Sequence, residues 1–515
     1  MSANARTISA RPGLVHAKRA RAAVAGERRL ALGALAVILL GSLVIVAMAA
    51  NRPSFISATS HTNFFPRWMA GPLGGIWPSL TRSNTTLRDL FSGSVALMYA
   101  GYVLGVRHAT ALPVRLLVGV VLAVHLVFFL SPPLALTDVF NYINYARMEV
   151  VHQLNPYAST PVLEPHSDPA FALSNWHHLL SPYGPLFTLL SFAIVPLGVA
   201  GSFWAFKGIL MAASLGTLAL VYRCAQMLDV EPRRAVLLVG LNPVVLVWGL
   251  GGDHNDFLMV FCIVLAFYLL LRAGALGARR EADPEPPATR NGAVRARRRP
   301  RAWILALSPP ELAAGGALVA ATALKASAGI LLPVVLAGLL RSPRRAVQVA
   351  LGMLASGVVV GAASLLAFGA HLPDLTTQGS LVTMISIPNL IGLALGQGGE
   401  TNTLHTALNV VLAGALLGCC VLAYRRREPL TASGWATVAL LVTLGWVLPW
   451  YVLWVLPLAA FSSSRRLRTV ALVLGAYLIV AWAPVTSAVM SALHLEPSKT
   501  ALGRQHQRLV KQLLN

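Results

Sequence analysis

Long apolar runs recur along the whole chain, and each is close to the roughly 20 residues that a helix needs to cross the hydrocarbon core of a bilayer. The clearest runs are residues 30–50, 111–130, 256–275, 345–368, 404–424 and 467–487. Soluble helices keep a polar face, which most of these segments lack, and the chain is 56% hydrophobic with only 11% charged residues. The sequence therefore predicts an all-α polytopic membrane protein rather than a large soluble helical domain.

Basic residues give the chain a net charge of +23, which would suit a nucleic-acid-binding protein. The positions of these residues argue against that class. The basic clusters are at residues 19–29, 279–301, 341–345, 425–427 and 465–468, and each adjoins an apolar run. Such clusters mark the cytoplasmic ends of membrane helices. The expected partner is the lipid bilayer, and no nucleic acid is predicted.

The basic clusters also predict the path of the chain. Residues 1–29 are predicted to be a disordered basic cytoplasmic tail, so that the run 30–50 goes outward as an uncleaved anchor. Alternation of the later runs then places residues 131–185 outside and leaves both ends of the apolar stretch 184–198 on the outer side. Because that stretch is short and interrupted by prolines, we expect a re-entrant or interfacial helix there.

Two further segments begin and end beside basic clusters. Residues 311–340 and 432–462 are too long for one comfortable crossing and too short for two. Each therefore predicts a hairpin of half-crossing helices. The turn of the first hairpin places Lys325 under the outer surface, and the turn of the second holds Trp450 and Tyr451.

The resulting division of the chain is an expectation from composition and charge. The predicted parts are the tail 1–29, an N-terminal transmembrane part 30–275 with a catalytic outer loop 131–185, a disordered Arg-rich cytoplasmic linker 276–302, a C-terminal transmembrane part 303–490 and a polar tail 491–515. The polar tail is placed outside, although its basic residues would prefer the cytoplasm.

Polar residues that are uncommon in membrane segments gather on the predicted outer side. Asp138 is the candidate catalytic carboxylate, because a carboxylate in a partly dry cavity can accept the proton of a reacting hydroxyl. The alternative is that Asp138 only caps a helix over 138–150. The motif GGDHND, residues 251–256, could hydrogen-bond a sugar or bind a cation, or its Asn255 or Asp256 could cap the following helix.

A lone ammonium among small residues needs an anionic partner, and for Lys325 a lipid phosphate would serve. The alternative is that Lys325 extends towards lipid headgroups. Trp450 and Tyr451 could stack on sugar rings or belong to an interfacial aromatic belt. The candidate substrate-binding residues are Tyr142, Trp176, Tyr183, His254, Asn255, Asp256, Asn389, Trp450 and Tyr451. No metal site and no cofactor are predicted, with a divalent cation left open.

A series of motifs between Asp138 and Pro457 has a familiar order. The motifs are TDVFNYINYAR, LNPY, SPYGPLF, LNPVVLVWGLGGDHNDFLM, LKASAGILLP, IPNLIG and LPWYVLWVLPL. This series resembles the polyprenol-phosphate-mannose-dependent α-1,6-mannopyranosyltransferases of actinobacteria, which belong to the GT-C superfamily of membrane glycosyltransferases. The resemblance implies a GT-C-type multi-helix transmembrane bundle with an extracytoplasmic catalytic loop. It also implies mannose transfer from a polyprenyl-phosphate donor to a mannan or lipomannan-type glycolipid acceptor outside the plasma membrane.

The resemblance further implies roles for individual residues. Asp138 would be the general base of an inverting single displacement, which needs no covalent sugar intermediate. Lys325 would neutralise charge on the leaving phosphate, with Arg147 as a second candidate for that task. The motif TDVFNY has one carboxylate and no adjacent acid, unlike acidic-pair relatives, and this disfavours a metal-bridged donor site.

Three other functions remain open at this stage. The first is a GT-C transferase for another polyprenyl-phosphate sugar, such as arabinose or glucose. The second is a lipid or glycolipid transporter, although transporters place charges near the bilayer midplane and often contain inverted repeats. The predicted charges here lie near the outer ends of the helices. The third is a scaffold without catalytic activity.

Overall fold

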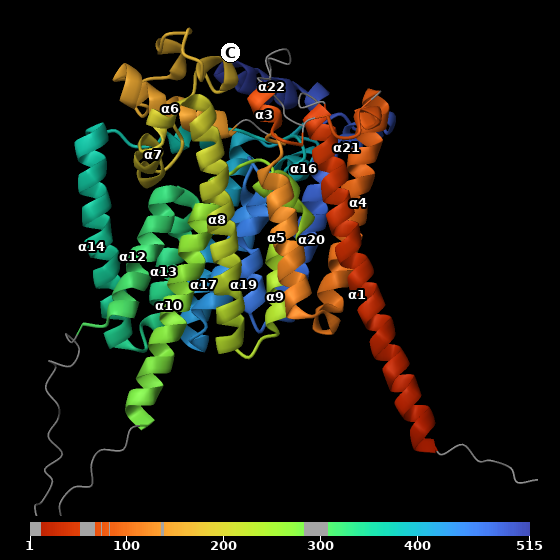
Figure 1. The fold of residues 1–515 in the computed structure, drawn as a ribbon. Helices are drawn as coiled ribbons and strands as arrows, with labels where there is room; N and C mark the ends of the chain where they lie inside the picture. Colours follow the sequence, from red (N-terminus) through yellow and green to blue (C-terminus); the bar gives the residue numbers. More distant parts are fainter. Residues whose placement is uncertain are drawn as a thin grey trace, which may run out of the picture.

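The computed structural model describes residues 12–51, 67–73, 75–81, 83–134, 138–282 and 307–514, and within these ranges it contains helices and turns but no strand. The long helices are α1 (Pro12–Asn51), α4 (Asn84–Arg107), α5 (Val114–Phe129), α8 (Gly198–Met227), α10 (Asp256–Ala282), α14 (Pro343–Phe368), α17 (Asn402–Arg426) and α20 (Arg465–Trp482). They form one bundle with roughly aligned axes (Figure 1). The predicted all-α fold is confirmed.

Six helices among the described residues are long and apolar enough to cross a membrane. A seventh candidate is the pair of α20 and α21 (Pro484–Ala492), which is bent by 70°. At 1.5 Å per residue, helices of this length match the thickness of a hydrocarbon core. The predicted polytopic membrane protein is confirmed by these lengths and compositions.

Local sequence signals define where several of these helices begin. The side chains of Ser83, Thr401 and Ser464 accept hydrogen bonds from the backbone N–H groups of Thr86, Leu404 and Leu467, and so cap α4, α17 and α20. Such caps satisfy backbone donors that have no partner within the helix. The helix α17 ends at Arg427, whose φ of 56° takes the backbone out of the helical path.

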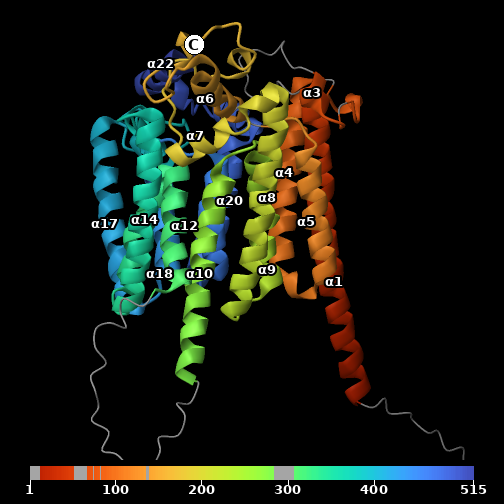
Figure 2. The ribbon, with the colours of Figure 1, turned by 60° about the vertical axis from the view of Figure 1, so that its left-hand side comes forward.

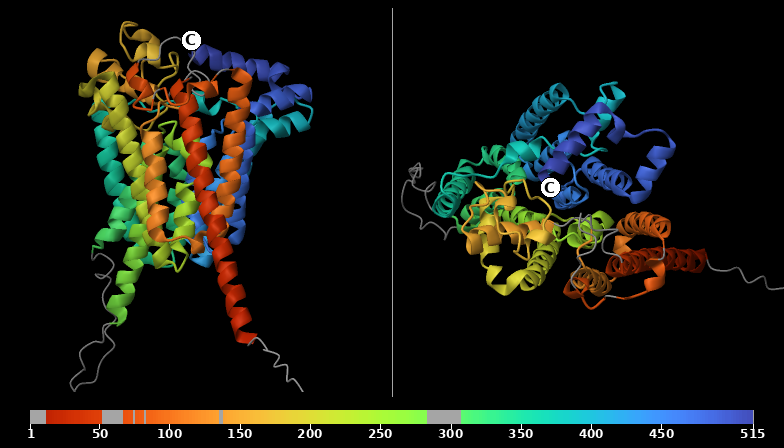
Figure 3. Two further views of the ribbon diagram at one scale, coloured as in Figure 1. Left: turned by 45° about the vertical axis from the view of Figure 1, so that its right-hand side comes forward. Right: turned by 90° about the horizontal axis from the view of Figure 1, so that it is seen from above.

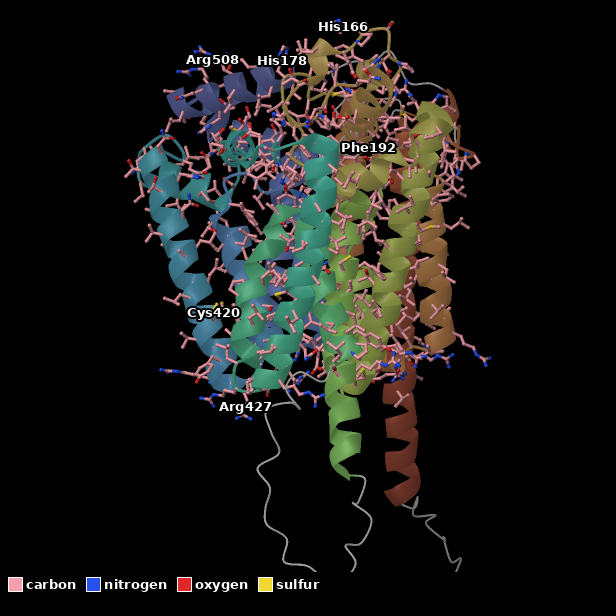
Figure 4. The ribbon with its side chains drawn as sticks, turned by 90° about the vertical axis from the view of Figure 1, so that its left-hand side faces the viewer. His166, His178, Phe192, Cys420, Arg427 and Arg508 are labelled. Atoms are coloured by element: carbon pink, nitrogen blue, oxygen red, sulfur yellow. The ribbon has the colours of Figure 1, made fainter. Side chains whose placement is uncertain are left out.

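The bundle has two chemically different ends. The basic end holds Arg427, and α1 and α10 project beyond the bundle there (Figures 1 and 4). The opposite end, which we call the loop end, holds His166, His178 and Arg508 together with the helices α6 (Asp138–His152), α7 (Pro185–Phe192) and α22 (Ala501–Leu514). In Figure 4, nitrogen-rich side chains gather at the basic end, as the basic clusters beside the apolar runs of the sequence predict.

Within the bundle, α12 (Pro309–Leu324) packs against α10 and α14. Figure 2 shows this group at one side of the molecule, with α1, α4 and α5 at the other side. The short elements that complete the structure are α3 (Arg67–Ala70), η1 (Pro78–Thr81), η2 (Ala109–Ala111), η3 (Pro161–Leu163), η4 (Phe171–Leu173), α15 (Leu375–Gly379), α16 (Ile387–Ala394) and η9 (Pro497–Lys499).

Each of the two segments predicted to form a hairpin is interrupted near its middle. In the first, α12 is followed by a break at Lys325, the short η7 (Ala326–Ile330) and α13 (Leu331–Leu339). In the second, α18 (Pro429–Thr443) is followed by η8 (Pro449–Trp454) and α19 (Leu456–Phe461). The Lys325 backbone is extended, with φ −154° and ψ 120°, so the helix cannot continue through it.

The predicted short helix at 184–198 is also observed, as α7 followed by η5 (Val195–Leu197).

The apolar run 235–251, in contrast, is not one straight helix. It consists of α9 (Pro232–Gly240) and the π-helical η6 (Val245–Leu250). Pro243 lies between them, and proline cannot donate the backbone hydrogen bond that a continuous helix would need. The break brings residues 251–256 to a turn inside the bundle.

The structure differs from the predicted disorder in two places. Residues 12–29 are helical as part of α1, and residues 276–282 continue α10. Ala and Arg are strong helix formers, and a helix already nucleated in the membrane segment propagates at little cost. Residues 1–11 and 283–302, also predicted to lack structure, lie outside the described residues. Within the predicted polar tail, for which the sequence neither predicts nor excludes structure, residues 501–514 form α22. Figure 3 shows α22, in dark blue, lying across the loop end.

Candidate active site

Asp138 is the first residue of α6, at the loop end of the bundle. Its side chain is 17% exposed, whereas Val139, Phe140 and Tyr142 behind it are buried. An anionic side chain in the first turn of a helix interacts favourably with the unpaired backbone N–H groups there. Asp138 is therefore a partly open carboxylate on a rigid, buried support.

The turn formed by residues 251–256 lies against this carboxylate. The Nδ1 atom of His254 is 3.2 Å from Asp138 Oδ2. The face of the His254 ring stacks on the Trp450 ring of η8, with centroids 3.4 Å apart and planes inclined by 11°. The imidazole is thus fixed between an indole and an acid that come from different parts of the chain.

Two glycines allow this turn to pack closely. A Cβ atom at Gly252 would lie 2.2 Å from the carbonyl oxygen of Trp248, which is too close for any other residue. The backbone N–H of Leu134 donates to the carbonyl of Gly251 at 2.7 Å. This bond ties the segment leading towards Asp138 to the turn that holds His254.

Tyr142 connects α6 to the same turn. The backbone N–H of Asn255 donates to the Tyr142 hydroxyl at 3.3 Å. The Tyr142 ring also meets Tyr183 edge to face, with centroids 4.7 Å apart. Just beyond Tyr183, the N–H of Gly184 donates to the carbonyl of Leu324 at 3.3 Å, so the loop also rests on the residue before Lys325.

Lys325 and Asp256 form the second charged group of the site. The Nζ atom of Lys325 lies 2.9 Å from each carboxylate oxygen of Asp256, and the indole N–H of Trp454 donates to Asp256 Oδ1 at 2.5 Å. The ammonium also lies 4.8 Å from the centroid of Tyr451 and 5.3 Å from that of Trp454. The anionic partner that the sequence required for Lys325 is therefore present within the chain, and the lysine is not simply extended to headgroups.

An apolar pocket lies directly beside this ion pair. It is a small crevice, with a cavity volume of about 10 Å³. It is lined by Met259, Ile263, Ser327, Ala328, Ile330, Leu331, Thr437, Leu440 and Trp454. Trp454 belongs both to the pocket wall and to the hydrogen-bonded group around Asp256, so a charged site and an apolar cavity share one side chain.

Several buried polar atoms at the site have no hydrogen-bond partner in the described part of the chain. They are both amide atoms of Asn255, both ring nitrogens of His254 and the Nε1 atom of Trp450; the His254 Nδ1 lies near Asp138 without forming a hydrogen bond. Burying such atoms unpaired is costly. A ligand with many hydroxyl groups would satisfy them, because hydroxyls both donate and accept hydrogen bonds.

Other predicted site residues are not brought into this group by their contacts. Arg147 is engaged by Asp168, with Nε–Oδ1 at 2.9 Å and Nη2–Oδ2 at 2.8 Å. The Asn389 amide bonds to the backbone of Met384 and Glu400. The Trp176 ring packs at an edge against Trp446, with centroids 6.3 Å apart. These side chains fasten loops at the loop end.

Two acidic side chains in the loop that follows α6 have shifted pKa values. Burial alone would raise the pKa of Asp168, but hydrogen bonds from Arg147, the Ala170 amide and His152 lower it below its usual value. Burial raises the pKa of Glu164 to about 7. In the described residues, no group of three or more His, Cys, Asp and Glu side chains is arranged to hold a metal ion.

Sequence reasoning did not select Lys207. Its Nζ lies 3.3 Å from each oxygen of the Asp253 carboxylate, and both side chains are buried. The available signal was the one used for Lys325, namely a lone lysine within an apolar run. Trp454 was likewise treated only as part of an aromatic segment, because its bond to Asp256 joins distant parts of the chain.

Comparison with known proteins agrees with the predicted family. The model for the N-terminal domain of the α-(1→6)-mannopyranosyltransferases matches residues 28–341, and the model for the MptB C-terminal domain matches residues 380–497. An α-(1→6)-mannopyranosyltransferase of Mycobacterium tuberculosis is 27% identical over 389 residues, which cover 67% of this chain and 65% of the relative.

Two further relatives have similar coverage. The α-(1→6)-mannopyranosyltransferase A of Mycobacterium tuberculosis is 27% identical over 381 residues, covering 67% of this chain and 65% of the relative. The protein of that name from Corynebacterium glutamicum is 24% identical over 364 residues, covering 62% and 66%. The match to the two mycobacterial relatives thus spans about 65% of their length. No solved structure matches the chain. Because the N-terminal family model alone covers more than half of its residues, the chain belongs to the α-(1→6)-mannopyranosyltransferase family.

Proposed function

We propose that this protein transfers mannose from a polyprenyl-phosphate-mannose donor to an α-1,6-mannan acceptor, such as a lipomannan-type glycolipid, at the outer face of the plasma membrane. The names of its relatives support mannosyl transfer. The observation that carries the proposal is the position of Asp138, a partly exposed carboxylate 3.2 Å from His254, beside buried polar atoms that lack partners.

Asp138 is assigned as the general base. A positioned carboxylate accepts the proton of the acceptor hydroxyl as that oxygen bonds to C1 of the sugar, while the bond from C1 to the phosphate oxygen breaks. His254 lies 3.2 Å from one oxygen of Asp138 and leaves the exposed part of the carboxylate for the hydroxyl. Asn255 and Trp450 would hydrogen-bond the sugar through their unpaired atoms. The reaction inverts the anomeric configuration, since it has one displacement and no covalent sugar intermediate.

Lys325 is assigned to the leaving phosphate. A preorganised cation stabilises charge that develops in the transition state. Asp256 and Trp454 fix the ammonium before the donor arrives, so that little reorganisation is needed when the phosphate departs. The apolar side chains that line the small crevice beside the same Trp454 ring suit contact with the first part of a polyprenyl chain.

The orientation follows from the charged ends. Under the positive-inside bias, the basic end faces the cytoplasm together with the N-terminus, and the loop end faces outward. This can be tested by introducing cysteine at Gln226, an exposed residue near the end of α8, and at Gln505, an exposed residue of α22. A membrane-impermeant maleimide should label only Gln505→Cys in intact cells. Labelling of Gln226→Cys alone would show the opposite orientation, with the basic end outside and the loop end in the cytoplasm.

Activity is tested in membranes containing the chain, supplied with polyprenyl-phosphate sugars and a short α-1,6-mannoside. We expect transfer from the mannosyl donor, and a loss of about 100-fold to 10,000-fold in Asp138→Asn. The matched control is Asp89→Asn, the same change at an exposed acid of α4 whose partner is Arg88, and it should retain activity. Transfer from an arabinosyl or glucosyl donor, with none from the mannosyl donor, would show that the transferred sugar is not mannose. Lipid movement without glycosidic bond formation would identify a transporter.

A further inference from the structure

We propose that Lys207 is a positioning residue: through its buried ion pair with Asp253, it sets the turn at residues 251–256 so that His254 meets Asp138 and Asp256 meets Lys325. The inference deepens the function proposed above and rests on it for its catalytic consequence. Its structural consequence, the fixed turn, can be measured without any activity.

Lys207 is held in an apolar part of α8. Its side chain is 1% exposed, and that of Asp253 is 3% exposed. The Nζ atom lies 3.3 Å from both carboxylate oxygens of Asp253. The rings of Phe203 and Trp204 enclose the ammonium, with centroids 5.4 Å and 5.9 Å away. A charged lysine in such surroundings is tolerated only with a partner, and the carboxylate that it contacts is that of Asp253.

Asp253 is also where the turn changes direction. Its φ is 56°, in the left-handed region, which aspartate adopts more readily than most residues other than glycine but still uncommonly. A residue in that region usually needs contacts beyond its own backbone to stay there. The ion pair with Lys207 supplies such a contact, and the direction of the backbone at Asp253 decides where the next side chain, His254, projects.

Besides the bond between Leu134 and Gly251, the turn makes contacts with the site itself. His254 meets Asp138 and Trp450, the Asn255 N–H meets the Tyr142 hydroxyl, and Asp256 meets Lys325. Substrate is expected to disturb these contacts when it binds. Lys207 approaches from α8, behind the turn, and so can hold the turn while the other partners rearrange. A displacement of about 1 Å at a reacting group can cost about 100-fold in rate.

The test compares Lys207→Met with a charge-free pair, Lys207→Gln combined with Asp253→Asn, in the purified full-length protein. A matched control is Ser214→Ala, on the same helix, which removes a buried hydrogen bond to His125 Nε2 of 2.9 Å. Each variant is assayed for kcat, for KM of both substrates, for thermal unfolding and for hydrogen exchange of the peptide covering residues 248–258.

We expect Lys207→Met to lower kcat by about 100-fold and to leave both KM values within about threefold, because the groups that contact substrate remain. Hydrogen exchange of the turn should become faster. Ser214→Ala should leave kcat and exchange of the turn unchanged. The charge-free pair should restore slow exchange and recover at least about tenfold of the lost kcat, since the two amides rebuild a hydrogen bond between α8 and the turn, which moves about one bond length closer to reach the shorter glutamine.

Three results would overturn the inference. The first is full kcat in Lys207→Met, and the second is unchanged exchange of the turn in that variant. The third is a charge-free pair with slow exchange but no recovery of kcat, because the charge itself would then be required. If Lys207→Met does not fold, the charge-free pair is compared with the unaltered protein. Slow exchange of the turn with kcat within about tenfold of the unaltered protein supports the inference, and slow exchange with a larger loss of kcat overturns it. An unaltered protein without any transfer activity, in which Lys207→Met still loosens the turn, would refute the proposed function while supporting the role of Lys207 in holding the turn.

Discussion

His254 and Asp138 lie on different structural elements, yet Nδ1 of the histidine is 3.2 Å from Oδ2 of the acid. The imidazole cannot rotate freely, because its face rests on Trp450 at 3.4 Å. His254 therefore restrains one oxygen of the carboxylate that we assign as the general base. An acid held in this way is ready to accept a proton without first reorienting.

Replacement of His254 by glutamine should lower kcat by about 10-fold to 100-fold, with little change in KM for the donor. Glutamine is too short and too flexible to stack on Trp450 and hold Asp138 at the same time. The measurement is steady-state transfer in membranes with equal amounts of inserted protein. His166→Gln serves as control, since His166 is exposed at the loop end. Equal losses of kcat in both variants would show that His254 has no specific role in the reaction.

Removal of Lys325 should affect stability and catalysis separately. Lys325→Met leaves the Asp256 carboxylate buried without its cation, which is expected to cost about 3 kcal/mol of unfolding free energy. Addition of Asp256→Asn should recover most of that stability. The double variant should nevertheless remain about 100-fold less active, because no cation faces the leaving phosphate. Thermal unfolding in detergent and transfer assays measure the two effects. Recovery of both in the double variant would show that Lys325 acts only through Asp256.

Arg147 should matter for the loop rather than for the donor. Its guanidinium is bound to Asp168 through two short hydrogen bonds. Because His152 and the Ala170 amide still hold Asp168, Arg147→Gln should destabilise the protein by about 2 kcal/mol and speed hydrogen exchange in the loop after α6. The KM for the donor should stay within about twofold of its original value. A large rise in that KM, with the loop intact, would instead support the role in phosphate binding that the sequence suggested.

The stability of the protein should fall as pH rises through the range in which Glu164 ionises. Burial raises the pKa of Glu164 from 4.5 in the unfolded chain to about 7 in the folded state. The folded state therefore binds the proton more tightly, so stability is greatest below about 4.5 and is lost as pH rises towards and beyond 7. Glu164→Gln should weaken this dependence and raise the melting temperature at pH 8.

A part of the slope should survive in Glu164→Gln, because burial also raises the pKa of Glu149. Asp168 acts in the opposite direction, but its lowered pKa confines its effect to pH values below its usual range. Differential scanning fluorimetry between pH 5 and pH 8 separates these contributions. An unchanged pH dependence in Glu164→Gln would show that Glu164 is already ionised in the folded state at low pH.

The sequence by itself determined the helical membrane fold, the interruption of the two helical segments and most of the side chains of the candidate site. Apolar length, proline positions and basic clusters are local properties, and they predicted both interruptions. Polar residues in apolar surroundings are also visible locally, which is why Asp138, His254, Asp256 and Lys325 were selected. The helix over residues 12–29 departs from the disorder that composition predicts, because helix propensity and continuity with a membrane helix prevail there.

Only the tertiary structure decided which polar groups became partners. The sequence required an anion for Lys325 but did not show that Asp256 supplies it, and it offered Arg147 to the donor although Asp168 engages it. It gave no reason to connect Lys207 with Asp253. The physical reason is that an ion pair depends on which helices are neighbours and on how far each is rotated about its axis. Those quantities are set by packing of the whole bundle, and no local stretch of sequence contains them.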